Sequence, residues 1–308
     1  MGEAKIAREH LVPAILNAGH EVTHVGRRIP GKIALPKIYG NAIETDYESI
    51  INDPSIDAIY NPLPNHLHVP YSIKALKSGK HVLCEKPLAL NLDELSQLES
   101  VAKDSNAFFY EAFMVRSHPQ WHWLQNLDIG KYQSSHFIFS YPKQPEGNVR
   151  NLIKYGGGPL FDIGCYAILS GCMLFKGEPK VLSAVATMCE QYETEKQLDA
   201  TLRWPNGEIL SFTVSANAAL CQTFTVLGSN GWAKLNVPVN PPKKTSAYWS
   251  NGGLQKGNKV EFPACNQYQL MVEEFVSRSE SGDPSDFLFS KIVTKAINDI
   301  RKIAGLTS

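Results

Sequence analysis

Three side chains have the types and positions needed to move a proton at a substrate oxygen. Lys86 stands in the tripeptide Glu85-Lys86-Pro87, directly after a short apolar run, and Asp162 and Tyr166 are four residues apart in a predicted helix. Residues four apart share one face of a helix. An unperturbed tyrosine has a pKa of about 10 and a lysine about 10.4, so each needs a shift to act near neutral pH. The plain alternatives are a first-turn carboxylate at Asp162 and a core aromatic ring at Tyr166.

A predicted strand–helix–strand unit positions Lys86. Residues 56–60 and 81–84 are apolar runs too short for helices, and the segment between them has helical spacing, with Asn65 as its expected N-cap. Two parallel strands joined by a helix bring their carboxyl ends to one edge of the sheet, where open α/β sheets bind ligands. The residues expected at that edge are Pro62, Leu63, Asn65, His68, Glu85 and Lys86.

The segment HVLCEKPLAL, with PLPNHLH before it and AFMVRSHP after it, resembles the corresponding segments of the Gfo/Idh/MocA oxidoreductases. The resemblance covers nearly the whole chain and is less close after about residue 240. It implies an α/β protein with an N-terminal Rossmann-type parallel sheet over residues 1–115. It also implies a C-terminal α+β domain with a large, mostly antiparallel open sheet over residues 116–308, whose last helix packs back on the first domain.

The residues agree with that organisation. From about residue 133 the chain has several sequential strand patterns joined by short turns, which is typical of an antiparallel sheet. Three glycines lead into an apolar helix over residues 159–174, which carries Asp162 and Tyr166. Residues 239–258 are polar and contain Pro-Pro and Gly-Gly pairs, so we expect a mobile loop there.

A dinucleotide turn is predicted at the N-terminus. Gly2, Ala4 and Ala7 have the spacing of GxGxxG/A with alanine in the middle position, and Lys5 and Ile6 open the helix that follows. Such a turn places N–H groups and a helix N-terminus against a pyrophosphate. The alternative is an ordinary helix start rich in glycine and alanine.

The strand that should precede this fingerprint is not in the sequence, because Gly2 follows Met1 directly. We expect either a misassigned start codon or a truncated chain, rather than a strand that is truly absent. A truly absent central strand would leave neighbouring edges unpaired and weaken cofactor binding.

The cofactor expected is NADP in preference to NAD. After the second predicted strand, Arg27 and Arg28 stand where NAD-preferring sites carry an acidic residue, and guanidinium groups suit a 2′-phosphate. Two solvated surface arginines are the alternative. The family resemblance implies that Arg116 lies near the nicotinamide. A structural ion pair with the linker is the alternative role.

The resemblance also implies that Asp162 and Tyr166 complete a site with Lys86, so that an ammonium group of the first domain and a phenol of the second meet beside the nicotinamide. We hypothesise that Tyr166 exchanges the proton with the substrate, Lys86 stabilises charge on the same oxygen, and Asp162 orients the substrate or Lys86. Lys86 as the direct proton carrier is an alternative. A sugar, a cyclic polyol or a trans-dihydrodiol is the implied substrate, with carbohydrate favoured and Asn65, His68 and Arg150 as polar contacts.

Two other readings remain: a non-catalytic NADP-binding sensor of the same fold, and an inactive fragment. The presence of Lys86, Asp162 and Tyr166 together favours the enzyme.

Composition excludes several classes of protein. The 308 residues are 43% hydrophobic with a formal net charge of zero, which supports ordinary cores and offers no electrostatic basis for a nucleic-acid partner. No membrane partner is expected. The six cysteines show no metal-ligand spacing, and most of them lie in apolar surroundings typical of buried thiols, which indicates a reducing cytoplasm. A homo-oligomer, dimer or tetramer, is expected through apolar strand positions. These are Val185, Thr187, Phe212, Val214 and Phe224.

Overall fold

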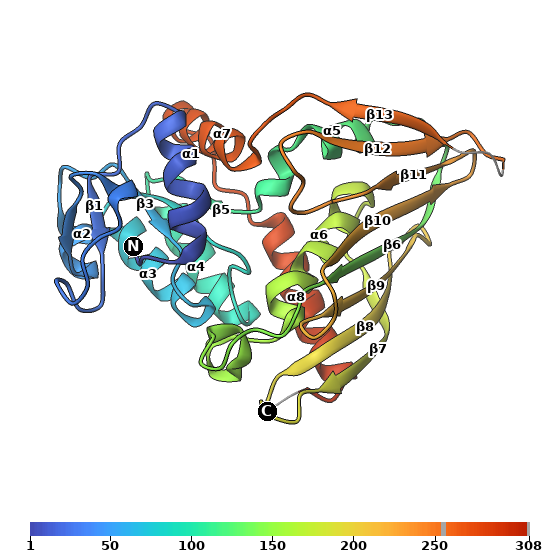
Figure 1. Ribbon diagram of the computed structural model, residues 1–308, viewed down its shortest axis with the longest axis horizontal. Coiled ribbons are helices and arrows are strands. Elements are labelled where there is room, and N and C mark those ends of the chain that lie inside the picture. Colours follow the sequence, from blue (N-terminus) through green and yellow to red (C-terminus); the bar gives the residue numbers. More distant parts are fainter. Residues whose placement is uncertain (254–256, 307–308) are drawn as a thin grey trace. The chain divides into compact units, whose positions relative to one another are not determined.

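The computed structural model describes residues 1–253 and 257–306, which form two compact units (Figure 1). The first unit contains residues Met1–Ser117 and Asn266–Phe287, and the second contains His118–Cys265 with the C-terminal segment from Leu288.

The helix that returns to the first unit is α7 (Gln267–Ser281), whose Tyr268 stacks on His10 with ring centroids 4.9 Å apart. The last helix was expected to pack on the first domain. That helix, α8 (Leu288–Ile303), belongs to the second unit and contacts α6 and β7, because its apolar residues Ile292, Val293 and Ile297 are buried there.

A parallel sheet in two parts forms the first unit. Strands β1 (His24–Gly26) and β2 (Ile43–Thr45) pair with each other, and β3 (Ala58–Asn61), β4 (His81–Cys84) and β5 (Phe109–Glu111) form the second part. The surrounding helices are η1 (Ala7–Leu11), α1 (Val12–Asn17), η2 (Lys37–Tyr39), α2 (Tyr47–Asn52), η3 (Asn65–Leu67), α3 (His68–Lys77), α4 (Leu92–Asp104) and η4 (Met114–Ser117). This is the Rossmann-like architecture that the sequence predicts.

Met1 and Gly2 lie between the two parts of the sheet. The main-chain N–H of Gly2 donates to the carbonyl of Gly26 at the end of β1 (2.7 Å), and the amino group of Met1 donates to the carbonyl of Tyr60 in β3 (2.5 Å). Burial lowers the pKa of that amino group to about 5. In the described part of the chain no strand comes before β1.

The helix starts at Asn65 and Asn91 in the first unit differ in their capping. Asn91 caps α4, since its side chain accepts the N–H of Glu94 at 2.9 Å. The expected cap at Asn65 is wrong: Asn65 lies inside the 3₁₀ turn η3, and α3 begins three residues later without a side-chain cap. Such 3₁₀ turns are frequent at the N-termini of α-helices.

An eight-stranded sheet with strand order β13-β12-β11-β10-β6-β9-β8-β7 is the centre of the second unit (Figure 1). Only the β6–β9 pair is parallel within this described sheet. The strands are β6 (Tyr132–Ser140), β7 (Lys180–Met188), β8 (Glu195–Arg203), β9 (Ile209–Ser215), β10 (Cys221–Gly228), β11 (Trp232–Leu235), β12 (Thr245–Ser250) and β13 (Asn258–Phe262). The helices of this unit are α5 (Pro119–Gln125), η5 (Val149–Asn151), η6 (Ile153–Tyr155), η7 (Leu160–Gly164), α6 (Cys165–Leu174) and α8.

Strand β12 corrects the prediction of a loop over residues 239–258. Residues 245–250 pair with both β11 and β13, and Ala247 is fully buried between them. The loop was predicted from the flanking Pro-Pro and Gly-Gly pairs, although Thr-Ser-Ala-Tyr-Trp-Ser between them alternates as a strand does. Residues 254–256 of the predicted loop lie outside the described residues.

One face of the large sheet is covered by α6, all of whose residues from Cys165 to Met173 are buried. Phe212, Val214 and Phe224 point to the covered face and are at most 3% exposed, so the expectation that they form an association surface is wrong. Successive side chains along a strand point to opposite faces of the sheet. The sequence analysis expected these three residues on the exposed face, whereas they lie on the covered one. Val185 on the edge strand β7 is 66% exposed, and Thr187 is also exposed.

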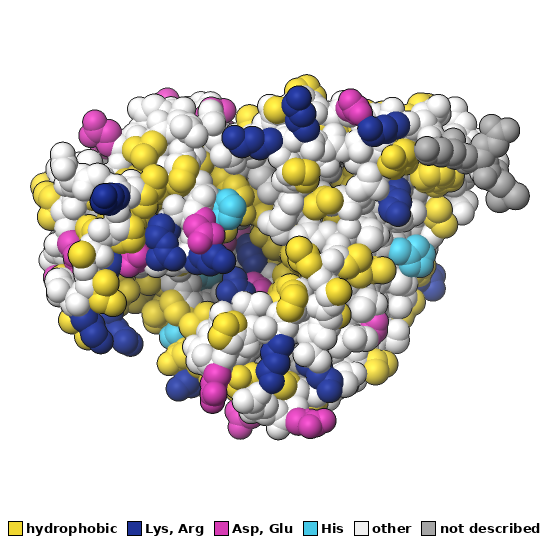
Figure 2. All heavy atoms as spheres, viewed as in Figure 1, with side chains coloured by type: hydrophobic (Ala, Val, Ile, Leu, Met, Phe, Trp, Pro, Cys, Tyr) yellow, Lys and Arg dark blue, Asp and Glu magenta, His cyan; other side chains and the backbone are white. Residues whose placement is uncertain are grey.

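Figure 2 shows acidic and basic side chains interspersed on the face that it displays, in keeping with the zero formal net charge. One described helical stretch, Ile153–Leu174, is long and apolar enough to cross a membrane, and 89% of its most apolar window is buried inside the protein. That position is the one a core helix occupies.

Candidate functional site

Lys86 follows strand β4 and is held from both sides in the first unit. Its neighbour Glu85 accepts the phenolic proton of Tyr60 at 2.7 Å, and the Lys86–Pro87 peptide bond is cis. Burial, together with the Glu85 carboxylate, raises the pKa of Tyr60, so this phenol remains a hydrogen-bond donor to Glu85. The segment that carries Lys86 is therefore anchored to strand β3.

His68 anchors the same segment from the other side. One ring nitrogen, Nδ1, lies 2.9 Å from the carbonyl of Pro87, and Nε2 lies 2.7 Å from the carbonyl of Leu63. The side chain is 1% exposed, and burial lowers the pKa of His68 to about 4. The ring thus lies between the two loops at the sheet edge, and as a neutral imidazole it donates to one of these two carbonyls.

The turn before His68 is organised by Asn61, which is fully buried. Its amide donates to the carbonyl of His68 (3.0 Å) and the hydroxyl of Ser72 (3.2 Å), while its oxygen accepts the N–H of Leu63 (3.3 Å). Pro62 and Leu63 are buried in this turn, whereas Asn65 is half-buried. Sequence reasoning placed ligand contacts here and missed Asn61 as the residue that shapes the turn.

The glycine turn fits a pyrophosphate. Gly2 has φ +74°, and a Cβ at this position would lie 3.0 Å from the side chain of Leu63. The helical segment begins at Lys5, after Ala4, and continues through Ile6 into η1. The first N–H groups of a helix have no acceptor within it, so this end of the segment can receive an anion. The residues present therefore suit the cofactor that the fold implies.

The two arginines after β1 have different surroundings. Arg27 is 9% exposed and donates to the carboxylates of Glu3 and Glu44 and to the carbonyl of Ile33. Arg28 is exposed. Only Arg28 of the predicted pair is therefore placed at the surface, and Glu3 and Glu44 are partners that sequence reasoning missed.

Arg116 lies in η4, and its guanidinium stands over the ring of Tyr110 at 5.3 Å from the centroid. A guanidinium over an aromatic face is attracted by the quadrupole of the ring. The contact fixes Arg116 within the first unit.

Asp162 lies in the second unit, in the π-helical turn η7 that precedes α6. Its Oδ2 accepts the phenolic proton of Tyr141 at 2.9 Å and the Nε–H of Arg150 at 2.7 Å. Burial, followed by the charge of Asp162, raises the pKa of Tyr141 and keeps that phenol protonated. Tyr166 follows in α6 and is 6% exposed. Single π-helical turns are frequent at functional sites, which agrees with the position of Asp162.

The buried carboxylate of Glu195 supports the turn η7. Glu195 at the start of β8 is 2% exposed, and its Oε1 accepts the N–H of Leu160 at 2.9 Å. Gly158 lies against the same carboxylate, because a Cβ there would be 2.5 and 2.6 Å from its two oxygens. Sequence reasoning assigned the glycines before the helix to a tight turn and missed Glu195.

The first unit is thus a Rossmann-like domain with a glycine turn and with Lys86 after strand β4. The second unit is a sheet domain that carries Asp162 and Tyr166. The chain belongs to the Gfo/Idh/MocA family of oxidoreductases. Residues 1–113 match the family model described as an oxidoreductase family with an NAD-binding Rossmann fold, and residues 121–234 match a C-terminal domain model of the same family.

Relatives extend the match over the whole chain. An uncharacterised oxidoreductase of Rhizobium meliloti is 32% identical over 326 residues, covering 99% of this chain and 95% of that protein. D-xylose 1-dehydrogenase (NADP(+)) 2 of Haloferax volcanii is 28% identical, covering 92% of this chain and 89% of that protein. Among solved structures, a 3-ketoreductase of Actinomadura kijaniata in complex with NADP and TDP-benzene has a TM-score of 0.88 at 25% identity, covering 97% and 95% of the two chains.

Proposed function

We propose that this oxidoreductase uses NADP to transfer a hydride between nicotinamide and a carbon that carries a hydroxyl or keto group in a sugar, cyclic polyol or dihydrodiol. The relatives described above include a xylose dehydrogenase named for NADP(+) and a ketoreductase crystallised with NADP. The exposed guanidinium of Arg28 suits a 2′-phosphate, and the turn at Gly2 suits the pyrophosphate. A carbohydrate is the favoured substrate.

One observation carries the proposal: Lys86 sits on a segment that is fixed at both of its neighbours. Glu85 receives a hydrogen bond from Tyr60, and the carbonyl of Pro87 is contacted by His68. A side chain that must stabilise charge on a reacting oxygen needs such a fixed base, because small displacements cost large factors in rate.

The bound cofactor supplies the hydride. In the reducing direction, the carbonyl oxygen of the substrate takes the phenolic proton of Tyr166. Lys86 donates a hydrogen bond to the same oxygen and stabilises its developing negative charge. Asp162, held by Tyr141 and Arg150, orients a hydroxyl of the substrate. In the oxidising direction Tyr166 takes the proton from the substrate hydroxyl.

The test replaces Lys86→Ala and Tyr166→Phe and follows reduced-nicotinamide absorbance with NADP or NAD and a panel of sugars and diols. Both variants should fold normally and lose about 10²-fold or more in kcat, while the exposed-lysine control Lys77→Ala and the control Tyr248→Phe should keep full activity. Full activity in both site variants would refute the assignment of residues. Cofactor binding without turnover of any substrate would indicate the sensor instead.

A cytoplasmic location and a homo-oligomeric state are part of this proposal. The six cysteines are all unpaired thiols, as a reducing compartment requires. The edge strand β7 exposes Leu182, Val185 and Met188, at 47%, 66% and 45%, and a second copy could cover them. Sedimentation of the purified protein tests the oligomeric state.

A further inference from the structure

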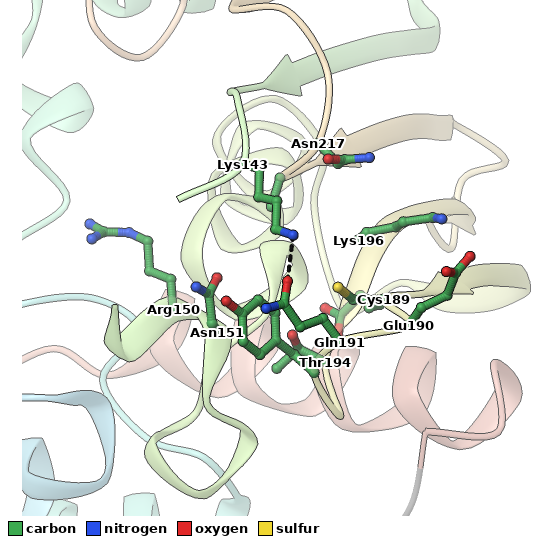
Figure 3. A pocket seen from close by; sticks show the side chains of 12 residues that line it. Lys143, Arg150, Asn151, Cys189, Glu190, Gln191, Thr194, Lys196 and Asn217 are labelled. Atoms are coloured by element: carbon green, nitrogen blue, oxygen red, sulfur yellow. Dashed lines mark hydrogen bonds between the residues drawn. The ribbon is translucent and has the colours of Figure 1, made fainter. Parts of the chain in front are cut away.

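A polar pocket of about 270 Å³ lies within the second unit (Figure 3). Three segments line it: the loop after β6, the turn between β7 and β8, and the residues that follow β9. Its lining includes Lys143, Arg150, Gln191, Glu195, Lys196 and Asn217. Apart from Arg150, which holds Asp162, the family comparison and the proposed chemistry assign no role to its lining.

The pocket borders the segment that carries Asp162. Arg150 lines the pocket, and its Nε–H donates to Oδ2 of Asp162 at 2.7 Å. Figure 3 shows the guanidinium of Arg150 directed away from the neighbouring Lys143 and Gln191. Glu195 also lines the pocket and accepts the N–H of Leu160, two residues before Asp162. Two lining residues therefore connect the pocket to the turn that carries Asp162, Arg150 through its hydrogen bond to Asp162 and Glu195 through its hydrogen bond to Leu160.

The donors and acceptors in the pocket suit hydroxyl groups. The ammonium group of Lys143 donates to Oε1 of Gln191 at 2.6 Å and lies 5.7 Å from the ring centre of Tyr192. Lys143 forms no ion pair with any residue that the structure describes. An ammonium group has three N–H donors, so two of them remain for a ligand, and the amides of Gln191 and Asn217 add donors and acceptors at the rim.

The charges favour a neutral ligand over an anion. Three basic residues of the lining, Lys143, Arg150 and Lys196, are accompanied by two carboxylates, and the guanidinium of Arg150 is already paired with Asp162. Glu190 is exposed, and it would repel an anionic group at the rim. A ring that carries many hydroxyl groups can use ammonium, amide and carboxylate groups at once.

We propose that this pocket binds a second, non-reacting sugar ring, so that the substrate is a glycoside or a short oligosaccharide. This inference rests on the proposed function, because the first ring is the one that reacts beside Asp162. A free monosaccharide would leave the pocket to water. Binding energy gained by the remote ring can be used to orient the reacting carbon, which raises kcat/KM for the longer substrate.

Saturation-transfer NMR on the NADP-loaded protein tests the inference with maltose, cellobiose and xylobiose beside glucose and xylose. At least one disaccharide should receive saturation on both rings and bind about tenfold more tightly than its monosaccharide, as one additional charged hydrogen bond can provide. Lys143→Ala and Gln191→Ala should abolish that gain and leave monosaccharide binding unchanged. The control Lys180→Ala, at the opposite end of β7 from the pocket, should change neither.

Saturation confined to one ring, equal affinity for disaccharides and monosaccharides, or an unchanged gain in Lys143→Ala would each overturn the subsite. Reduced-nicotinamide absorbance recorded on the same samples keeps the two proposals apart. Turnover of a monosaccharide with no benefit from a second ring refutes the subsite and retains the oxidoreductase. Two-ring saturation that depends on Lys143, without any hydride transfer, retains the subsite and refutes the proposed reaction.

Discussion

The carboxylate of Glu195 accepts the main-chain N–H of Leu160 at 2.9 Å, and this bond joins strand β8 to the π-helical turn that carries Asp162. Burial raises the pKa of Glu195 despite this bond, so the carboxyl group is held where ionisation is costly. The ring of Phe161, on the same turn, is covered by the guanidinium of Arg301 at 5.2 Å. The position of Asp162 therefore depends on two residues far from it in sequence.

Glu195→Ala should lower both stability and activity. It leaves the buried N–H of Leu160 without its acceptor, which costs about 1–3 kcal/mol in the free energy of unfolding, measured by urea denaturation. A shifted Asp162 should also lower kcat. Glu195→Gln keeps an oxygen acceptor at this position and should retain most of both properties. Equal losses in the two variants would show that charge, and not the bond to Leu160, is what matters.

Arg28→Ala and Arg27→Ala should separate cofactor choice from stability. Arg28 is exposed, so its loss should raise KM for NADP about tenfold, as one charge-assisted contact implies, and leave KM for NAD unchanged. Arg27 is 9% exposed and bonded to Glu3 and Glu44, so its loss should lower the free energy of unfolding by about 3 kcal/mol. An NADP-specific effect in Arg27→Ala with unchanged stability would reverse these roles.

The pH dependence of stability should contain a contribution from His118. Its Nδ1 accepts the N–H of Gln120 at 3.0 Å, so Nε2 carries the proton and faces Sγ of Cys265 at 3.5 Å. Burial, and secondly the neighbouring His122, lowers the pKa of His118 from 6.5 to about 4. Between these two pH values the unfolded chain binds more protons, so the free energy of unfolding falls as the pH falls, by about 3 kcal/mol in all.

His118→Asn should flatten this part of the profile, because asparagine caps a helix without titrating. Urea denaturation between pH 7 and pH 4 measures it, with His122→Asn on the same helix as the control. His68 titrates in both proteins, so the difference between variant and wild type isolates His118. A profile that keeps its slope in His118→Asn would assign the dependence to other groups.

Local patterns made a large part of the first unit predictable. Residues 81–84 and the cap at Asn91 could be recognised because short apolar runs and side-chain caps are decided by neighbours in sequence. Asn65 was misplaced as a cap because the choice between a 3₁₀ turn and an α-helix depends on how the loop packs. The same limit hid Asn61, whose three bonds close a turn that a sequence pattern does not describe.

In the second unit, position in the sheet decided what the sequence could reveal. The helix with Asp162 and Tyr166 was predictable from its apolar composition and the glycines before it. Glu195 lies in a polar stretch that resembles a solvated turn, and only the strand order places it beneath Leu160. The face to which Phe212 points likewise depends on register, because a shift of one residue reverses every side chain.

Asn61→Ala should destabilise the first unit and loosen the turn of residues 61–68, whose His68 contacts the segment of Lys86. It removes two donors, to the carbonyl of His68 and the hydroxyl of Ser72, and one acceptor, for the N–H of Leu63. The buried groups left without partners cost about 1–3 kcal/mol in the free energy of unfolding. Asn61→Asp should cost more, because a buried carboxylate can accept the N–H of Leu63 but cannot donate to the other two groups.

Calorimetric unfolding of both variants measures this order, with the exposed Asn52→Ala as the matched control. Because His68 contacts the carbonyl of Pro87, displacement of His68 should also raise KM for the cofactor in Asn61→Ala. If Asn61→Asp were as stable as the wild-type protein, the side chain of Asn61 would act only as an acceptor, and the two donated bonds would contribute nothing to the turn.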